Sequence, residues 1–153
     1  MNSDFNQNLI GIRPISYQET YLIRQEVLRP DRPLDTCHFL GDELSSTFHR
    51  GAFYQEKLVG IISVFENDNK LFKQENQYQI RGMALLPDYQ KYGLGKKLIE
   101  YAEKLLKENN VSLAWCNARE IAVKFYEKSG YKIIGEAFDI PDVGIHWVMW
   151  KEL

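Results

Sequence analysis

Two short segments of the sequence carry residue types that could do chemistry. The first is the glycine-containing run Gln90-Lys91-Tyr92-Gly93-Leu94-Gly95-Lys96, which stands between an apolar segment and an amphipathic one. The second is Phe125-Tyr126, which is followed by Gly130 and Tyr131. A strand that enters a helix through a glycine turn directs several free backbone N–H groups toward one point, and such a point binds anions, phosphate above all. The first segment therefore predicts a phosphate site.

The flanking residues predict the elements that would hold this site. The range 78–86 has the β-favouring residues and apolar finish of a strand, and Pro87 ends it because proline has no N–H to donate. Beyond Gly95, apolar residues recur at helical spacing on one face. Glu103 is expected on the opposite, exposed side, where it would pair with Lys107. The predicted apolar face consists of Leu94, Leu98, Tyr101, Ala102 and Leu105.

Three kinds of glycine-rich phosphate loop compete for the first segment. A P-loop requires Gly-x-x-x-x-Gly-Lys-Ser/Thr, but the residue five before Gly95 is Gln90, and no hydroxyl follows Lys96. A dinucleotide fingerprint starting at Gly93 would have Leu98 at its third small position. The pattern that fits is Gln/Arg-x-x-Gly-x-Gly/Ala. Preceded by a strand that ends in proline, it resembles the acetyl-CoA loop of the GCN5-related N-acetyltransferases (the GNAT superfamily).

The second segment has its own resemblance to this superfamily. Residues 117–131 end with an aromatic pair, a glycine and a further aromatic residue, as in many members. The resemblance implies that Tyr126 is the general acid, which protonates the CoA thiolate as it leaves. The chemistry suits a tyrosine because a phenol and an alkyl thiol have comparable pKa values. The alternative is that Tyr126 is an aromatic core residue next to Phe125.

The resemblance also implies contacts between the donor and particular residues. Met83, Ala84 and Leu85 would lie beside the pantetheine arm, and the N–H near Leu85 would polarise the thioester carbonyl. Gln90 to Lys96 would surround the pyrophosphate, and Asn117 would contact the cofactor from the neighbouring parallel strand. Taken by itself, Asn117 also predicts the N-cap of a helix.

The resemblance covers nearly the whole chain and implies the GNAT fold. This is an α/β (α+β) architecture with a mixed, mostly antiparallel sheet of about seven strands and about four helices, whose two parallel strands splay apart at the cofactor site. The length of 153 residues favours one domain, residues 1–153, with residues 1–8 loose. Ser16 and Glu19 form a capping box, and Tyr21, Leu22, Ile23 and Val27 are expected on the buried side of the following helix. Strands are also predicted at residues 9–15, 47–54, 58–65, 111–116, 131–138 and 144–150, and a last helix at 118–129 that ends at Gly130.

Composition excludes several classes of function. A net charge of −2 and a pI near 5.9 do not favour binding to nucleic acid or to an anionic membrane. The apolar runs are shorter than the ~20 residues that span a bilayer, and the N-terminus lacks the pattern of a secretory signal. Cys37 and Cys116 are isolated, so we expect reduced thiols and a cytoplasmic protein. Three histidines predict no metal cluster.

The C-terminal segment Gly144-Ile145-His146 resembles the ElaA-like branch, which has Gly-Ile-Pro-His before a methionine. The proline is missing here, so an edge-strand histidine without a ligand is the alternative for His146, and His49 is similarly ambiguous. The base that would deprotonate an amine is open among Asp42, Glu43 and His146 on chemical grounds.

The predicted function is transfer of the acetyl group of acetyl-CoA to a primary amine of a small molecule or peptide, by direct attack in a ternary complex. One alternative is a catalytically silent acyl-CoA-binding regulatory domain, and another is a nucleotide-binding domain. A homodimer is also open, with Trp147 or Trp150 at its interface.

Overall fold

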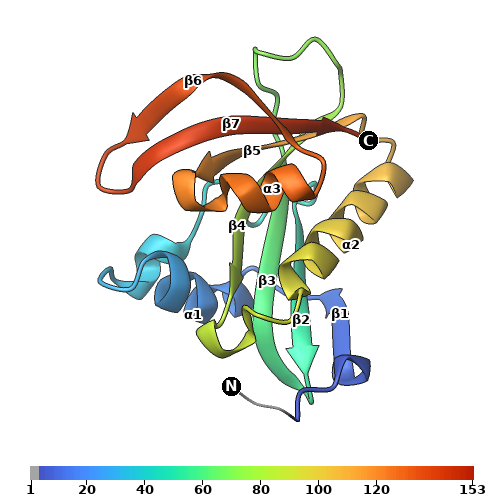
Figure 1. The fold of residues 1–153 in the computed structure, drawn as a ribbon, viewed down its shortest axis with the longest axis vertical. Coiled ribbons are helices and arrows are strands. Elements are labelled where there is room, and N and C mark those ends of the chain that lie inside the picture. The colour runs from blue at the N-terminus through green and yellow to red at the C-terminus, as the bar shows by residue number, and fades with distance from the viewer. Residues whose placement is uncertain (1–3) are drawn as a thin grey trace. The chain divides into compact units, whose positions relative to one another are not determined.

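The computed structural model describes residues 4–153. Seven strands form a mixed sheet in the order β1-β2-β3-β4-β5-β7-β6, which confirms the predicted fold class (Figure 1). The chain divides into two compact units, Met1–Phe65 with Gly82–Ala102 and Glu66–Arg81 with Glu103–Leu153. Strand β4, Gln77–Leu85, and helix α2, Leu94–Glu108, contribute residues to both units. That the whole chain acts as one domain remains a prediction.

The first unit contains three antiparallel strands (Figure 1): β1 is Ile10–Pro14, β2 is Phe48–Tyr54 and β3 is Lys57–Glu66. Gln55 and Glu56 join β2 to β3 with positive φ values of 47° and 69°. A two-residue hairpin loop favours left-handed residues at both positions because their twist matches that of the strands. These two strands therefore form close to the ranges 47–54 and 58–65 that the sequence predicts.

The segment after β1 begins as predicted and continues differently. Ser16 and Glu19 form both capping-box hydrogen bonds, at 2.9 and 3.2 Å. The expected single helix is instead a succession of short turns: 3-10 at Gln18–Thr20, helix α1 at Tyr21–Ile23 and a π-helical turn at Arg24–Leu28. Leu22, expected to be buried, is 71% exposed, whereas Arg24 is completely buried. A buried ion pair decides which side of this segment faces inward.

In the second unit, the start of β4 pairs in parallel with β5, Leu113–Arg119, through Gln77–Gln79 and Leu113–Trp115. Strand β7, Gly144–Glu152, lies antiparallel between β5 and β6, and β6 is Lys132–Ile140 (Figure 1). His146 is thus on an inner strand, and the expectation of an edge strand is wrong.

The helix predicted at 118–129 starts later than expected. Strand β5 extends through Asn117 to Arg119, a 3-10 turn follows at Glu120–Ala122, and helix α3 spans Val123–Lys128. Asn117 therefore does not cap a helix, because residues 117–119 pair with Val148 to His146 on β7. Pairing with a distant strand overrides the local cap preference. Gly130 ends the helix in the left-handed conformation with φ of 95°, as predicted.

Within residues 4–153 the structure has three α helices, where the sequence predicted about four. Helix α2 buries Leu94, Leu98 and Ala102 as expected, whereas Tyr101 is 37% exposed. Ile23, Ile61 and Ala84 form a core cluster in the first unit. In the second unit, Leu113, Trp115 and Val148 form another.

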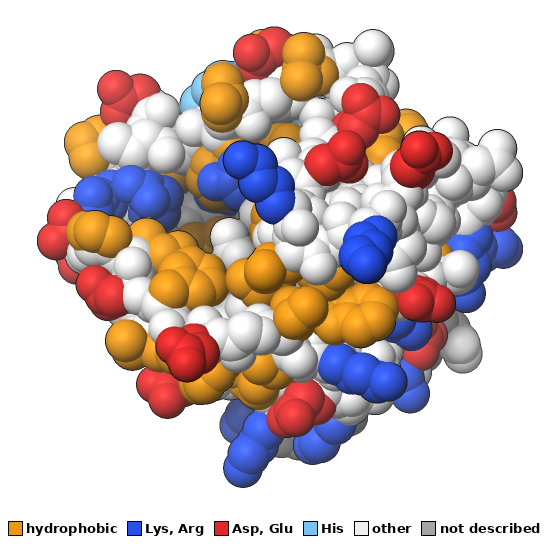
Figure 2. All heavy atoms as spheres, turned by 90° about the horizontal axis from the view of Figure 1, so that it is seen from above, with side chains coloured by type: hydrophobic (Ala, Val, Ile, Leu, Met, Phe, Trp, Pro, Cys, Tyr) orange, Lys and Arg blue, Asp and Glu red, His pale blue; other side chains and the backbone are white. Residues whose placement is uncertain are grey.

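Charged side chains of both signs are interspersed with apolar ones over the face that Figure 2 shows. Across residues 4–153, no helix combines the length and apolar character required to cross a membrane. The same residues contain no group of three or more His, Cys, Asp or Glu side chains arranged to hold a metal ion. Short 3-10 turns at Gln7–Leu9, Leu34–Cys37 and Pro87–Tyr89 complete the elements.

Candidate functional site

The end of β4 has a fixed position in the first unit. Leu86 N–H donates to the carbonyl of Val59 on β3 at 2.9 Å, and the Gln90 side-chain amide donates to the carbonyl of Leu85 at 2.9 Å. The Leu85 side chain packs over Gly60, where an added Cβ would lie 2.4 Å from Leu85 Cδ2. Gly60 therefore lets β4 end close against β3, and Gln90 connects the loop to the strand end.

The loop after β4 turns into α2 at Gly93. A single 3-10 turn follows Pro87, and Gly93 then adopts a φ of 74°, which disfavours any residue with a Cβ. Lys97 N–H donates to the carbonyl of Gly93 at 3.3 Å, so Gly93 is the cap of the helix. The N–H groups of Leu94, Gly95 and Lys96 form the first turn of α2, where a helix offers donors and positive dipole to an anion.

The charge at this turn suits a diphosphate. Lys91 and Lys96 are exposed, and Lys97 is half-buried. The first unit thus brings together, on one strand end, loop and helix start, the residues predicted from sequence to bind the donor: Met83, Ala84, Leu85, Gln90, Lys91, Tyr92, Gly93, Leu94, Gly95 and Lys96. Lysines beside the N-terminus of a helix suit a phosphate-bearing ligand.

Tyr126 lies in the second unit, on α3, with 7% of its surface exposed. Its hydroxyl donates a hydrogen bond to the Cys116 thiol on β5. Burial, reinforced by Cys116, raises the pKa of Tyr126 well above its usual value. The ring packs edge-on against Phe125 and Tyr131, with centroids 5.3 and 5.6 Å away. Tyr126 is therefore fully protonated at neutral pH.

A polar network beside Tyr126 was not predicted. The Tyr131 hydroxyl donates to Glu103 Oε2 at 2.8 Å, and Lys151 Nζ donates to Glu103 Oε1 at 2.8 Å and to the Ser129 carbonyl at 3.0 Å. Burial and Glu103 together raise the pKa of Tyr131. Glu103 is only 6% exposed, so its expected exposed pairing with Lys107 is wrong. Helical spacing is equally compatible with a surface pair and with a buried carboxylate whose partners come from other elements.

Asn117 also belongs to the second unit and is exposed on β5, opposite Val148 of β7. Cys116, one residue earlier, is 2% exposed and is therefore a core residue. Burial raises the pKa of the Cys116 thiol to about 12. The alternation along β5 therefore places the Asn117 amide on the surface and the Cys116 thiol against Tyr126.

Asp42, one of the three candidate bases, is part of a buried ion pair in the first unit. Arg24 binds both of its carboxylate oxygens, at 2.6 and 3.0 Å, and the Phe39 N–H donates to it at 2.8 Å. Arg24 also donates to the carbonyl of Cys37 and to Ser63 Oγ. With its oxygens occupied and 2% exposed, Asp42 holds the fold together.

His49 is buried in the same cluster. Its Nδ1 lies 2.7 Å from Ser63 Oγ, and its Nε2 lies 2.9 Å from the carbonyl of Asp42. Burial lowers the pKa of His49 below the usual value for histidine, despite the opposing effect of Asp42. His49 therefore completes a buried polar network, which resolves the ambiguity of its role.

The other two candidate bases, Glu43 and His146, differ in burial and in hydrogen-bond partner. Glu43 is exposed, and its Oε2 lies 2.6 Å from Nε2 of His38. His146 is 4% exposed, and its Nδ1 lies 2.7 Å from the carbonyl of Gly144. A ring nitrogen next to a carbonyl carries the proton, so Nε2 of His146 is the nitrogen that can accept one.

Comparison with known proteins decides the family. A sequence model of the acetyltransferase (GNAT) family matches residues 12–131. The chain belongs to the GNAT family. It is 39% identical over 145 residues to a Bacillus subtilis (strain 168) protein described as the uncharacterized N-acetyltransferase YitI, covering 95% of this chain and 97% of that one. This GNAT protein is therefore an acetyltransferase.

Solved structures show the same fold. An aminoglycoside 6'-N-acetyltransferase complexed with coenzyme A has a TM-score of 0.76 at 14% identity and covers 93% of this chain and 96% of its own. The PaiA N-acetyltransferase from Thermoplasma acidophilum in complex with coenzyme A has a TM-score of 0.64 at 20% identity, with coverage of 94% and 99%. At these identities the likeness concerns the GNAT fold and not the acceptor.

Proposed function

We propose that this acetyltransferase takes acetyl-CoA as donor and transfers the acetyl group to a primary amine of a small molecule or peptide, by direct attack in a ternary complex. The observation that carries the proposal is the strand end of β4 followed by the Gly93 turn and the first turn of α2. Acetyl-CoA supplies the activated acetyl thioester.

In this proposal the first unit binds the donor. Gln90 to Lys96 hold the pyrophosphate through backbone N–H groups and lysine charge, without a metal ion. Met83, Ala84 and Leu85 pair with the extended arm through their backbone groups, as an edge strand does with an added strand. The Leu85 N–H donates to the thioester carbonyl oxygen, which gains negative charge during attack.

In the same proposal the second unit supplies Tyr126 as the general acid for the thiolate and Asn117 as a donor contact. The raised pKa of Tyr126 means that its hydroxyl is protonated at neutral pH, as a general acid must be before it can give up a proton. Its hydroxyl already donates to a sulfur, that of Cys116. The family pattern is what pairs Tyr126 with the donor.

The amine must lose a proton before it attacks. Asp42 is excluded as the base by its ion pair with Arg24. Glu43, through His38, and His146, through Nε2, remain the two candidates for this step. The net charge of −2, with charges of both signs on the face in Figure 2, gives no reason to expect a nucleic-acid acceptor.

Two measurements test the proposal. Thermal-shift assays with acetyl-CoA, ATP and NAD should show stabilisation by acetyl-CoA, whereas stabilisation by ATP or NAD alone would contradict it. A thiol-release screen over polyamines, amino sugars, amino acids and peptide N-termini should then identify an acceptor. If acetyl-CoA binds but none of these acceptors causes release of the coenzyme A thiol, the catalytically silent acyl-CoA-binding domain is favoured.

A cytoplasmic location is part of the same proposal. Cys37 and Cys116 are both free and buried, as expected in a reducing compartment. A homodimer that uses Trp147 or Trp150 stays a prediction, which analytical ultracentrifugation would test.

A further inference from the structure

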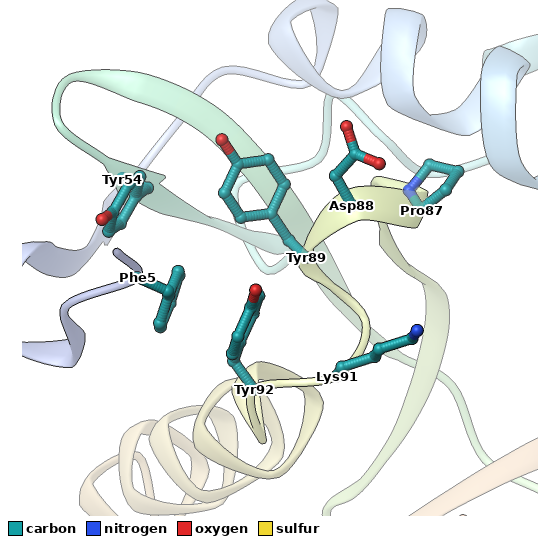
Figure 3. A pocket seen from close by; sticks show the side chains of 7 residues that line it. All are labelled: Phe5, Tyr54, Pro87, Asp88, Tyr89, Lys91 and Tyr92. Carbon is teal, nitrogen blue, oxygen red and sulfur yellow. The ribbon is translucent and has the colours of Figure 1, made fainter. Parts of the chain in front are cut away.

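Three aromatic rings are stacked at the donor loop, and the middle one comes from the start of the chain. Phe5 lies between Tyr92 of the loop and Tyr54 at the end of β2 (Figure 3). Its ring centroid is 3.8 Å from that of Tyr92, at 5° between planes, and 4.7 Å from that of Tyr54, at 12°. Tyr89 approaches edge-on, with its centroid 6.4 Å from that of Phe5.

Polar contacts attach the same segment to both sides of this stack. Asn6 N–H donates to the Tyr54 hydroxyl at 3.1 Å. The Gln7 side-chain amide donates to the carbonyl of Tyr92 at 3.4 Å, and its oxygen accepts from Lys97 Nζ at 3.2 Å. Gln7 therefore connects the last residue before Gly93 to the first turn of α2. The sequence predicted a loose segment at residues 1–8, of which 1–3 lie outside the described residues, whereas residues 5–7 make these contacts.

The stack borders a cavity of about 340 Å³. Its walls are formed by residues of the N-terminal segment, the end of β2 and the loop: Phe5, Tyr54, Pro87, Asp88, Tyr89, Lys91 and Tyr92 (Figure 3). Movement of Tyr92 into this cavity is opposed by the Phe5 stack and by the hydrogen bond from Gln7 to the Tyr92 carbonyl. Because Tyr92 precedes Gly93, such movement would change the direction of the N–H groups that begin α2.

We propose that Phe5 and Gln7 are positioning residues for donor binding, which act through Tyr92. They hold the loop in its phosphate-binding conformation before the donor arrives, so that binding does not have to order it. This inference rests on the proposed function, because the donor is acetyl-CoA. Neither residue touches the donor in this proposal, and the stack is a support for the loop alone.

Acetyl-CoA affinity, measured by isothermal titration calorimetry, tests the proposal. Phe5→Ala should raise the Kd for acetyl-CoA about tenfold, which corresponds to about 1.4 kcal/mol, and Gln7→Ala should raise it about threefold. Phe5→Tyr, which keeps a stacking ring, should stay within twofold of the parent. Asn8→Ala, an exposed position in the same segment, is the matched control and should change nothing. An unchanged Kd in Phe5→Ala would overturn the proposal.

A double-mutant cycle tests whether Phe5 acts through Tyr92. In a Tyr92→Ala background, Phe5→Ala should have no further effect on the Kd, because the ring it supports is gone. If the effects of the two substitutions on the free energy of acetyl-CoA binding are fully additive, Phe5 does not act through Tyr92.

Hydrogen exchange of the free protein separates positioning from a general structural role. Phe5→Ala should speed amide exchange at residues 91–96 and leave the amides of β2 and β3 as slow as in the parent. Faster exchange throughout the first unit, or an unchanged exchange rate at residues 91–96, would overturn the proposal. If the parent itself fails to bind acetyl-CoA, the proposed function fails, whereas the exchange result still reports on the support of the loop.

Discussion

The donor loop, Gln90–Lys96, and the acid cluster around Tyr126 are built in opposite ways. The loop is exposed at Gln90, Lys91, Gly93 and Lys96, presents backbone N–H groups and is contiguous in sequence. The acid cluster is buried and consists of side chains from separate elements, with Cys116 on β5, Tyr126 on α3 and Glu103 on α2. Substitutions at the exposed side chains of the loop should therefore change donor affinity with little loss of stability. Substitutions in the acid cluster should change turnover and stability.

The largest expected effect is the loss of the proposed acid. Tyr126→Phe keeps the ring and its packing but removes the proton, so kcat should fall about 100-fold or more, in line with general-acid catalysis. The Kd for acetyl-CoA should stay within about twofold of the parent. Steady-state thiol release with the acceptor found in the screen, together with calorimetry, measures both.

Two results for Tyr126→Phe would contradict this assignment of catalysis to the acid cluster and donor binding to the loop. A kcat equal to that of the parent would show that the proton comes from elsewhere. A large rise in Kd with unchanged kcat would place Tyr126 in donor binding and remove the contrast with the loop.

This contrast also explains how far the sequence could predict the structure. Pro87 and Gly93 mark the strand end and helix start through backbone constraints that act locally, so both positions could be predicted from the sequence. At the second site only Tyr126 and Gly130 carried such local signals. The helix start was misplaced because β7 pairs with residues 117–119, an interaction with no local trace in the sequence.

Buried polar groups were the least predictable feature, for the same reason. Arg24 and Glu103 occupy helical positions typical of exposed charges, and only their distant partners make burial possible. Leu22 is exposed because Arg24 points inward to Asp42. The ion pair depends on a residue 18 positions away, which hydrophobic periodicity cannot reveal.

The second prediction concerns the stability of the acid cluster. Glu103→Ala leaves the Tyr131 hydroxyl and Lys151 without their carboxylate, so the free energy of unfolding should fall by about 2–3 kcal/mol. Glu100→Ala is the matched control on the same helix, where an exposed carboxylate lies 3.8 Å from Lys96. It should change stability by less than about 0.5 kcal/mol. Urea unfolding measures both variants. Equal losses in the free energy of unfolding would mean that the buried Glu103 network stabilises the protein no more than the exposed pair does.

The third prediction uses two glycines that have nearly the same left-handed backbone conformation. Gly93 has φ of 74° and Gly135, in β6, has φ of 77°, and an added Cβ would meet no atom within 4 Å at either position. Gly93→Val and Gly135→Val should each cost about 1–2 kcal/mol of strain. Only Gly93→Val should also weaken acetyl-CoA binding, by about tenfold, in calorimetry. Equal affinities in the two variants would show that the turn at Gly93 does not direct the phosphate donors.

The smallest expected effect tests whether burial, rather than membership of one unit, sets sensitivity to pH. His49 lies in the same unit as the exposed loop but is buried, and burial lowers its pKa from 6.5. The unfolded chain then binds a proton at His49 at a higher pH than the folded protein does. The contribution of His49 is therefore fully present above about pH 6.5 and decreases as the pH falls below it, by at most about 1.4 kcal/mol per pH unit. Urea unfolding between pH 7.5 and 5 should show a shallower decline for His49→Gln than for the parent. Parallel curves of the free energy of unfolding against pH would mean that His49 does not contribute to acid sensitivity. The buried cluster would then tolerate a protonated His49 without loss of stability.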